Sequence, residues 1–243
     1  MQVEALAVRL RPRTAMEAAD LGVRLCQHAV RSVYLCYGLV AVPVIALAMA
    51  SFGVATWLPS LVIWWAKPWL DRTILFVLAR TAFNQRTAPG DLWREQRQVW
   101  WRQIVFTWTV RRFSPWRSLT QPVYQLEGFS ILTAGPRVRQ IRRGKAGTAF
   151  LMTSAFALAE GALTGALVSL LFWFAPSGQT PDLLELLSGE QPAFALAWTI
   201  AYGVAVLFLE PFFVAAGFAM YLTRRAELEA WDIEQEFRRA FAH

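Results

Sequence analysis

The chain has 243 residues, of which 56% are hydrophobic and 17% are charged, and it contains twelve tryptophans. A water-soluble domain of this size would not stay in solution with so apolar a composition, which therefore indicates an integral membrane protein. The net charge of +7 fits nucleic-acid binding in principle, but the basic residues flank apolar segments, and we expect no nucleic-acid partner.

The sequence lacks the residue patterns of common active sites. His28 and His243 are the only histidines, and Cys26 and Cys36, the only cysteines, do not have the spacing of a thiolate metal site. No P-loop, Gly-x-Ser-x-Gly elbow or dinucleotide fingerprint occurs. We therefore expect no enzyme activity, no metal and no cofactor, although a mechanism that uses carboxylates alone stays open.

The first expected elements are an entry helix and two membrane spans. Thr14 and Glu17 have the spacing of a capping box, which predicts a helix over residues 15–31 along the cytoplasmic face. Residues 33–52 form an apolar run of the length that a bilayer core about 30 Å thick requires. Residues 55–82 are also long enough to span. Polar and helix-breaking side chains interrupt this second run at Lys67, Pro68, Asp71 and Arg72.

Residues 91–112 predict an amphipathic helix. Apolar and aromatic side chains gather on one face of its helical wheel and arginines on the other, as in helices that lie in the membrane interface and bind anionic headgroups. Packing against the protein's own bundle is an equal alternative. The interfacial residues would be Trp93, Arg94, Trp100, Trp101, Arg102, Arg111 and Arg112.

Two further spans and a tail follow, over residues 148–174, 193–222 and 223–241. Gly161 and Gly165, four residues apart in the third span, favour close helix packing within the chain, with dimerisation as the lesser alternative. The tail is too acidic for lipid and predicts a cytoplasmic helix. The candidate site residues of this tail helix are Arg224, Arg225, Glu229, Trp231 and Asp232.

The distribution of basic residues predicts the orientation. Residues 53–59 and 175–192 contain no Lys or Arg, whereas every other connecting segment and both ends are rich in arginine. Because positively charged loops stay in the cytoplasm, both termini should be cytoplasmic. The expected fold is all-α: a polytopic membrane helical bundle with about four transmembrane helices plus amphipathic helices, forming a single domain over residues 1–243.

Charged side chains inside the expected spans predict a buried cluster. Glu160 and Glu210 each lie 13 residues from the cytoplasmic edge of an antiparallel span, so they reach the same depth, and Lys67 reaches a similar level. Asp71 lies one turn further along. Two interpretations stay open: the charges pair and fix helix register, or they handle ions or protons. The adjacent prolines, Pro211 and Pro68, should kink their helices.

Four stretches of the chain carry a family resemblance: RPRTAMEAADLGVRL, WWAKPWLDRTILFVLAR, RRFSPWRSLTQPVYQLEG and LEPFFVAAGFAMYLTRRAELEAWDIEQEFRR. Together they resemble the amino-terminal membrane region of an uncharacterised family of bacterial inner-membrane proteins. Members carry a carboxy-terminal domain of unknown function and are typically encoded beside MoxR-type ATPases and transglutaminase-like proteins. The last stretch also resembles, more loosely, the membrane domain of some glycerophosphodiester phosphodiesterases.

The resemblance implies a topology and a location in the bacterial inner membrane, but no catalytic residue. Because relatives continue past the position of His243, we expect a stand-alone or shortened member. The leading functional hypothesis is a non-enzymatic scaffold that presents a basic cytoplasmic face to anionic lipid and to protein partners. The alternative is a small transporter or channel component that uses the Glu/Lys cluster, and a lipid-processing enzyme is a weak third.

Overall fold

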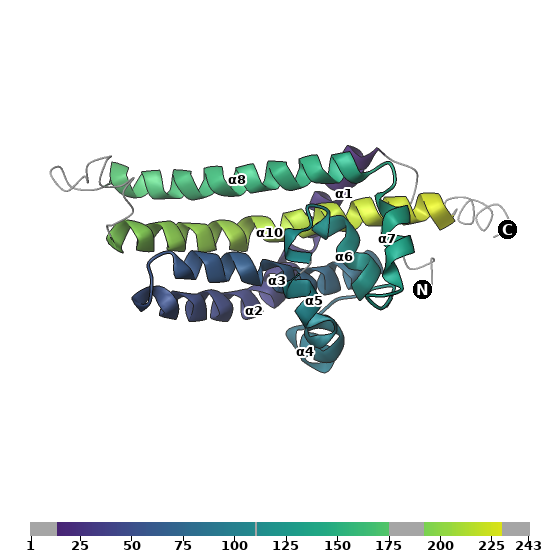
Figure 1. Ribbon diagram of the computed structural model, residues 1–243, viewed down its shortest axis with the longest axis horizontal. Coiled ribbons are helices and arrows are strands. Elements are labelled where there is room, and N and C mark those ends of the chain that lie inside the picture. The colour runs from purple at the N-terminus through teal and green to yellow at the C-terminus, as the bar shows by residue number, and fades with distance from the viewer. Residues whose placement is uncertain (1–13, 110, 175–191, 230–243) are drawn as a thin grey trace.

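A computed structural model describes residues 14–109, 111–174 and 192–229, and these residues form helices and no strand. Figure 1 shows an elongated bundle in which α8 and α10 lie side by side, next to the α2–α3 hairpin. The long helices are α1 (Ala15–His28), α2 (Val30–Ala50), α3 (Leu58–Ala82), α8 (Ala146–Trp173) and α10 (Pro192–Glu229). The short ones are η2 (Ser51–Gly53), α4 (Pro89–Arg94), η3 (Arg97–Trp101), α5 (Ile104–Trp108), η4 (Arg111–Phe113), α6 (Arg117–Gln125) and α7 (Ala134–Arg142).

Within the described ranges, three helices are long and apolar enough to cross a membrane, and they indicate a membrane protein. They are Val30–Gly53, Ala146–Leu170 and Pro192–Glu229. Four spans were expected. The difference lies in α3, which has 25 residues but carries Lys67, Asp71 and Arg72 along its middle. These three side chains are buried among other helices, so the composition of α3 reflects its place inside the bundle.

Helix α10 is the central element of the bundle, because α1, α2, α3, α6, α7 and α8 all contact it. Its closest neighbours approach at glycines. A Cβ atom on Gly22 of α1 would lie 2.1 Å from the carbonyl oxygen of Ala215, and one on Gly217 would lie 2.3 Å from the Cβ of Ser118 in α6. The expected entry helix therefore forms, with the Thr14 capping box, but it packs against α10.

The expected close packing at Gly161 and Gly165 is not found. A Cβ atom at either position would meet nothing within 4 Å, because α8 packs mainly against α10 and exposes much of its surface. In this helix the small-residue spacing does not mark a tight contact with another described helix.

The predicted single helix over residues 91–112 is corrected to a series of short segments: α4, a π-helical turn, α5 and a 3-10 turn. Gln103 adopts a left-handed conformation, with φ 57°, between two of them. The cause lies in α3, since the guanidinium of Arg72 donates to the carbonyls of Val99 and Gln98. The indole of Trp100 donates to Thr73 at 2.9 Å. These buried contacts draw the chain inward at the point where a continuous helix would have stayed on the surface.

Ion pairs fix the final turns of α10. Arg137 of α7 contacts both Glu127, at 2.8 Å, and Glu229. Lys145, just before α8, lies 3.0 Å from Glu227. The hydrogen bond to Glu127 raises the pKa of Arg137. At the arginine-rich end of the bundle, these contacts join the last turns of α10 to α7 and to the residue that precedes α8.

The structure also places part of the predicted tail helix in this set of ion pairs. Arg224 pairs with Glu227 at 2.8 Å, and Arg225 pairs with Glu229 at 3.0 Å. Helix α10 therefore continues beyond the predicted end of the fourth span at residue 222. The remaining tail residues, Trp231 and Asp232 among them, lie outside the described residues.

We expect Gly217→Ala and Gly22→Ala to destabilise the protein by about 1–3 kcal/mol, the usual cost of overpacking, because each new methyl group would enter the space of a neighbouring helix. Gly38→Ala in α2 is the matched control, since its methyl group meets open space. Thermal unfolding in detergent would measure the three variants. Equal melting temperatures for all three would contradict the close approach of α1 and α6 to α10.

Candidate functional site

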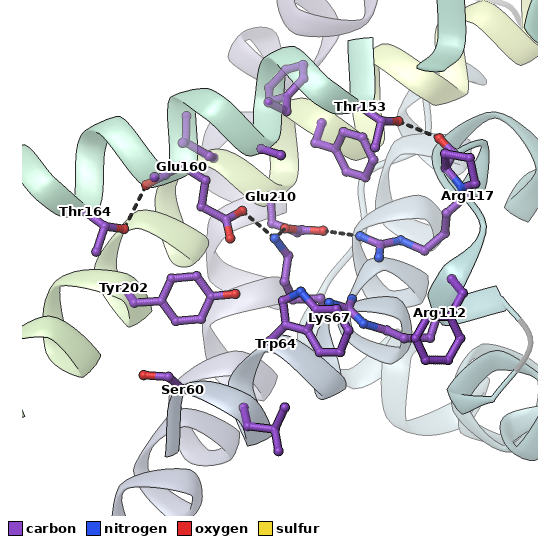
Figure 2. A pocket seen from close by; sticks show the side chains of 18 of the residues that line it. Ser60, Trp64, Lys67, Arg112, Arg117, Thr153, Glu160, Thr164, Tyr202 and Glu210 are labelled. Carbon is purple, nitrogen blue, oxygen red and sulfur yellow. Dashed lines mark hydrogen bonds and ion pairs between the residues drawn. The ribbon is translucent and has the colours of Figure 1, made fainter. Parts of the chain in front are cut away.

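The structure brings together the three charged residues that the depth calculation matched. The ammonium of Lys67, in α3, contacts Glu160 of α8 and lies 2.7 Å from Oε2 of Glu210 in α10. Figure 2 shows these side chains converging between three long helices. One lysine thus bridges two acids that are 50 residues apart in the sequence.

A fourth member, Arg117, comes from the short helix α6. Its Nε lies 2.8 Å from Oδ2 of Asp71, and its terminal nitrogen donates to Oε1 of Glu210 at 2.8 Å. The carboxylate of Glu210 is therefore held by two cations, one from α3 and one from α6. Sequence reasoning missed Arg117, because it is one of many arginines in a segment that was assigned to the cytoplasmic side.

Side-chain amides fix α6 against α3. Gln125 donates to the carbonyl of Arg72 at 2.8 Å, and Gln121 contacts the carbonyl of Pro68 at 3.4 Å. Both glutamines are buried, so their amides would be costly to leave without partners. With Ser118 close to Gly217, these contacts fix the position from which Arg117 reaches the acids.

The two predicted helix kinks remain predictions. Pro68 and Pro211 both lie inside helices that continue through them, α3 and α10. One turn before Pro211, the hydroxyl of Tyr34 donates to the carbonyl of Phe208 at 2.7 Å. Neighbouring side chains thus supply hydrogen bonds to the backbone near a proline, as is common in apolar helices.

The five charged residues are almost fully removed from solvent. Glu210 and Asp71 are 1% exposed, and Arg117 and Lys67 are each 8% exposed, whereas the side chain of Glu160 keeps 14%. Removing two charges from water is costly, and their attraction compensates only with good geometry. Glu160 makes one ionic contact and has the greatest exposure, so it is the member least tightly held.

A cavity of about 680 Å³ adjoins the cluster. Its charged lining consists of Lys67, Glu160, Glu210, Arg117 and Arg112 (Figure 2). Aromatic side chains cover much of the remaining surface: Trp64, Phe113, Phe156, Trp198, Tyr202 and Phe213. Its volume is in the range of small-molecule binding sites, which combine apolar walls with a few polar groups.

The residues predicted to lie in the membrane interface divide into two groups. Trp93, Arg94 and Trp101 are exposed. The other four contact the protein itself: Trp100 packs on Trp69, Arg102 donates to the carbonyl of Gly128, Arg111 stacks on Tyr124 and Arg112 stacks on Trp64. The alternative of packing against the bundle therefore describes these four.

Burial affects the two stacked arginines. It lowers the pKa of Arg111 to about 9 and that of Arg112 to about 10. Both guanidinium groups stay charged at neutral pH, and the aromatic faces beneath them provide cation–π stabilisation. Neither arginine forms an ion pair with another described residue.

No family model, curated protein or solved structure matches the chain. In the part of the chain that the structure describes, no group of three His, Cys, Asp or Glu residues could hold a metal ion. The geometry of the site combines buried ion pairs, made by two cations and three acids, with an adjacent cavity.

We expect Arg117→Leu to destabilise the protein by about 3–5 kcal/mol. It leaves Asp71 without its cation, and Glu210 keeps only Lys67. Arg139→Leu, at an exposed position of α7, should have little effect. Adding Asp71→Asn to Arg117→Leu should restore part of the loss. Thermal unfolding in detergent measures each variant, and the pairing would be contradicted if Arg117→Leu and Arg139→Leu had the same melting temperature.

Proposed function

We propose that this protein crosses the bacterial inner membrane four times and works as a small proton-linked transporter or channel component. The observation that supports this most directly is the contact of Lys67 and Glu160 at the edge of the cavity. Ionisable residues inside membrane helices are costly and commonly mark pathways for ions or substrates. Here such residues line a space of small-molecule size.

The length and position of α3 support a fourth crossing. A helix of 25 residues is about 37 Å long at about 1.5 Å per residue, enough to pass a hydrocarbon core about 30 Å thick. Helix α3 follows α2 after a short turn and packs beside it (Figure 1). If α2 crosses the membrane, α3 returns through it with its charges facing the bundle.

The orientation in this proposal places the arginine-rich end of the bundle, with both chain ends, in the cytoplasm. Single cysteines at Val54 and at Gly135 test it, in a background that carries Cys26→Ala and Cys36→Ala. Both test positions are exposed, and they lie at opposite ends of the long helices. An impermeant thiol reagent should label the residue-54 cysteine in spheroplasts and the residue-135 cysteine only after lysis. The reverse pattern would invert the orientation.

Glu160 has the geometry of an exchangeable group. It shares Lys67 with Glu210, it has no second cationic partner among the described residues, and it lies on the cavity wall. Release of Glu160 would leave Lys67 paired with Glu210, so the change costs less than breaking an isolated buried pair. A proton bound to Glu160 would have this effect, since it removes the charge that attracts the lysine.

Proton movement into liposomes tests the proposed transport. Purified protein is reconstituted around the dye pyranine, and a potassium diffusion potential drives protons inward. Wild-type protein and Glu95→Gln, at an exposed position outside the cluster, should acidify the lumen faster than protein-free vesicles. Glu160→Gln should abolish this flux and cost only about 1 kcal/mol in stability, because the amide keeps the shape and can still form hydrogen bonds. Absence of flux with wild-type protein would contradict proton-linked transport.

A second candidate is the scaffold that presents a basic surface to anionic lipid and protein partners. The observation in its favour is the exposure of Trp93 and Trp101, 68% and 61%, close to the exposed Arg94. Exposed indole rings beside arginines suit the headgroup region of a bilayer. Burial of Arg111 and Arg112 reduces the basic surface that a scaffold would offer, so this function ranks second.

A further inference from the structure

The charged residues that line the cavity differ in how they are paired. Lys67, Arg112 and Arg117 face two acids, Glu160 and Glu210. Lys67 and Arg117 form the ion pairs with these acids, and Arg117 also holds Asp71 behind the wall. Arg112 is therefore the lining cation that lacks an ion pair among the described residues.

Arg112 is also deeply buried. It is 7% exposed, its Nε has no hydrogen-bond partner among the described residues, and its guanidinium lies 3.4 Å from the centre of the Trp64 ring. A buried cation without an ionic partner is unfavourable because it has lost its hydration. Stacking on an aromatic ring compensates only part of that cost. Such a group has a strong tendency to bind an anion that reaches it.

The stacked geometry suits a planar or tetrahedral oxyanion. When one face of a guanidinium lies against an indole ring, its N–H groups still point outward in the plane, where they can donate two parallel hydrogen bonds to a carboxylate or phosphate. Figure 2 shows the hydroxyl of Tyr202, which comes from α10, pointing into the cavity that Arg112 also lines. This hydroxyl is buried beside the carboxylate of Glu160, and it makes no hydrogen bond of regular geometry to another described residue.

The rest of the cavity is suited to an apolar group. Leu61, Phe156, Leu209 and Phe213 line it together with Trp198. Helix α8, which forms one side, exposes much of its surface and would face lipid in the proposed topology. A ligand that carries both an oxyanion and an alkyl part would satisfy both kinds of wall.

We propose that the cavity binds an amphiphilic anion, with its phosphate or carboxylate group held by Arg112 and Tyr202 and its alkyl part against the apolar wall. This inference rests on the proposed function, because it names the ligand class of the same cavity. The ligand could come from the bilayer, as an anionic phospholipid, or from solution, as a free alkyl carboxylate. Both share the oxyanion and the alkyl chain.

Binding to the purified full chain in a non-ionic detergent tests the proposal. The probes are dioctanoyl phosphatidic acid, octanoate, uncharged dioctanoylglycerol and inorganic phosphate, with Kd measured by microscale thermophoresis. We expect saturable binding of phosphatidic acid, octanoate or both, and their relative Kd values identify phospholipid or free acid as the source. Equal binding of dioctanoylglycerol would overturn the role of the oxyanion, and equal binding of inorganic phosphate would overturn the role of the alkyl part. Absence of saturable binding for both phosphatidic acid and octanoate would overturn the whole proposal.

Variants of Arg112 separate binding from structural support. Arg112→Gln should weaken binding of the preferred anion by about tenfold or more, the expected loss of a charge-assisted hydrogen bond. It should leave the melting temperature unchanged or higher, because it removes an unpaired buried charge, whereas Arg139→Gln should change neither quantity. Arg112→Gln with wild-type affinity would contradict the proposal, and so would a loss of stability as large as that of Arg117→Leu.

This experiment is independent of proton flux, because it uses no membrane and no gradient. Glu95→Gln, at an exposed position outside the cavity, is expected to keep both the flux and the wild-type affinity for the anion. Binding without flux in the wild-type protein would contradict transport and retain the ligand assignment. Flux without binding would retain transport and contradict the ligand assignment.

Discussion

The carboxylate of Glu210 is the point on which the rest of the bundle depends. It lies near the middle of α10, at 1% exposure, with Lys67 and Arg117 on its two oxygens. A lone carboxylate at this depth would be among the most costly groups in the protein. Its two partners come from different elements, so satisfying one acid fixes α3 and α6 against α10 at the same time.

The small residues of α10 make this arrangement possible. Arg117 can reach Glu210 only because α6 approaches α10 at Gly217, where Ser118 occupies the space that any larger side chain would fill. On the α1 side, Gly22 lies against the backbone of Ala215. Close packing without a hydrophobic driving force is typical of helices in lipid. Here it serves to bring polar side chains within ionic reach.

The sequence predicts the long helices and part of the charged cluster well. Helices rise by a constant amount per residue, so counting along two antiparallel spans was enough to match Glu160 with Glu210 and to include Lys67. The segment after α3 was not predictable in this way. Its path depends on hydrogen bonds from Arg72 to two carbonyls, contacts that join residues about 26 positions apart and leave no periodic pattern in the sequence. For the same reason the pattern could not distinguish Arg112 or Arg117 from the exposed arginines near them.

The helices of the bundle differ in how firmly polar contacts attach them to their neighbours. Two contacts join α10 to the segment that begins with α6. Arg117 of α6 contacts Glu210 near the middle of α10, and the hydroxyl of Tyr221, near the end of α10, donates to Glu127, two residues past α6. Two separated attachments oppose rotation of this segment against α10. Helix α8 packs along α10, and its polar contacts with other elements are Lys145 just before its start, Trp116 and Thr153 near its start, and Glu160 near its middle. Between Glu160 and the end of α8 no polar contact joins it to another described element, so without the Glu160 pair this half of the helix is attached by apolar packing alone.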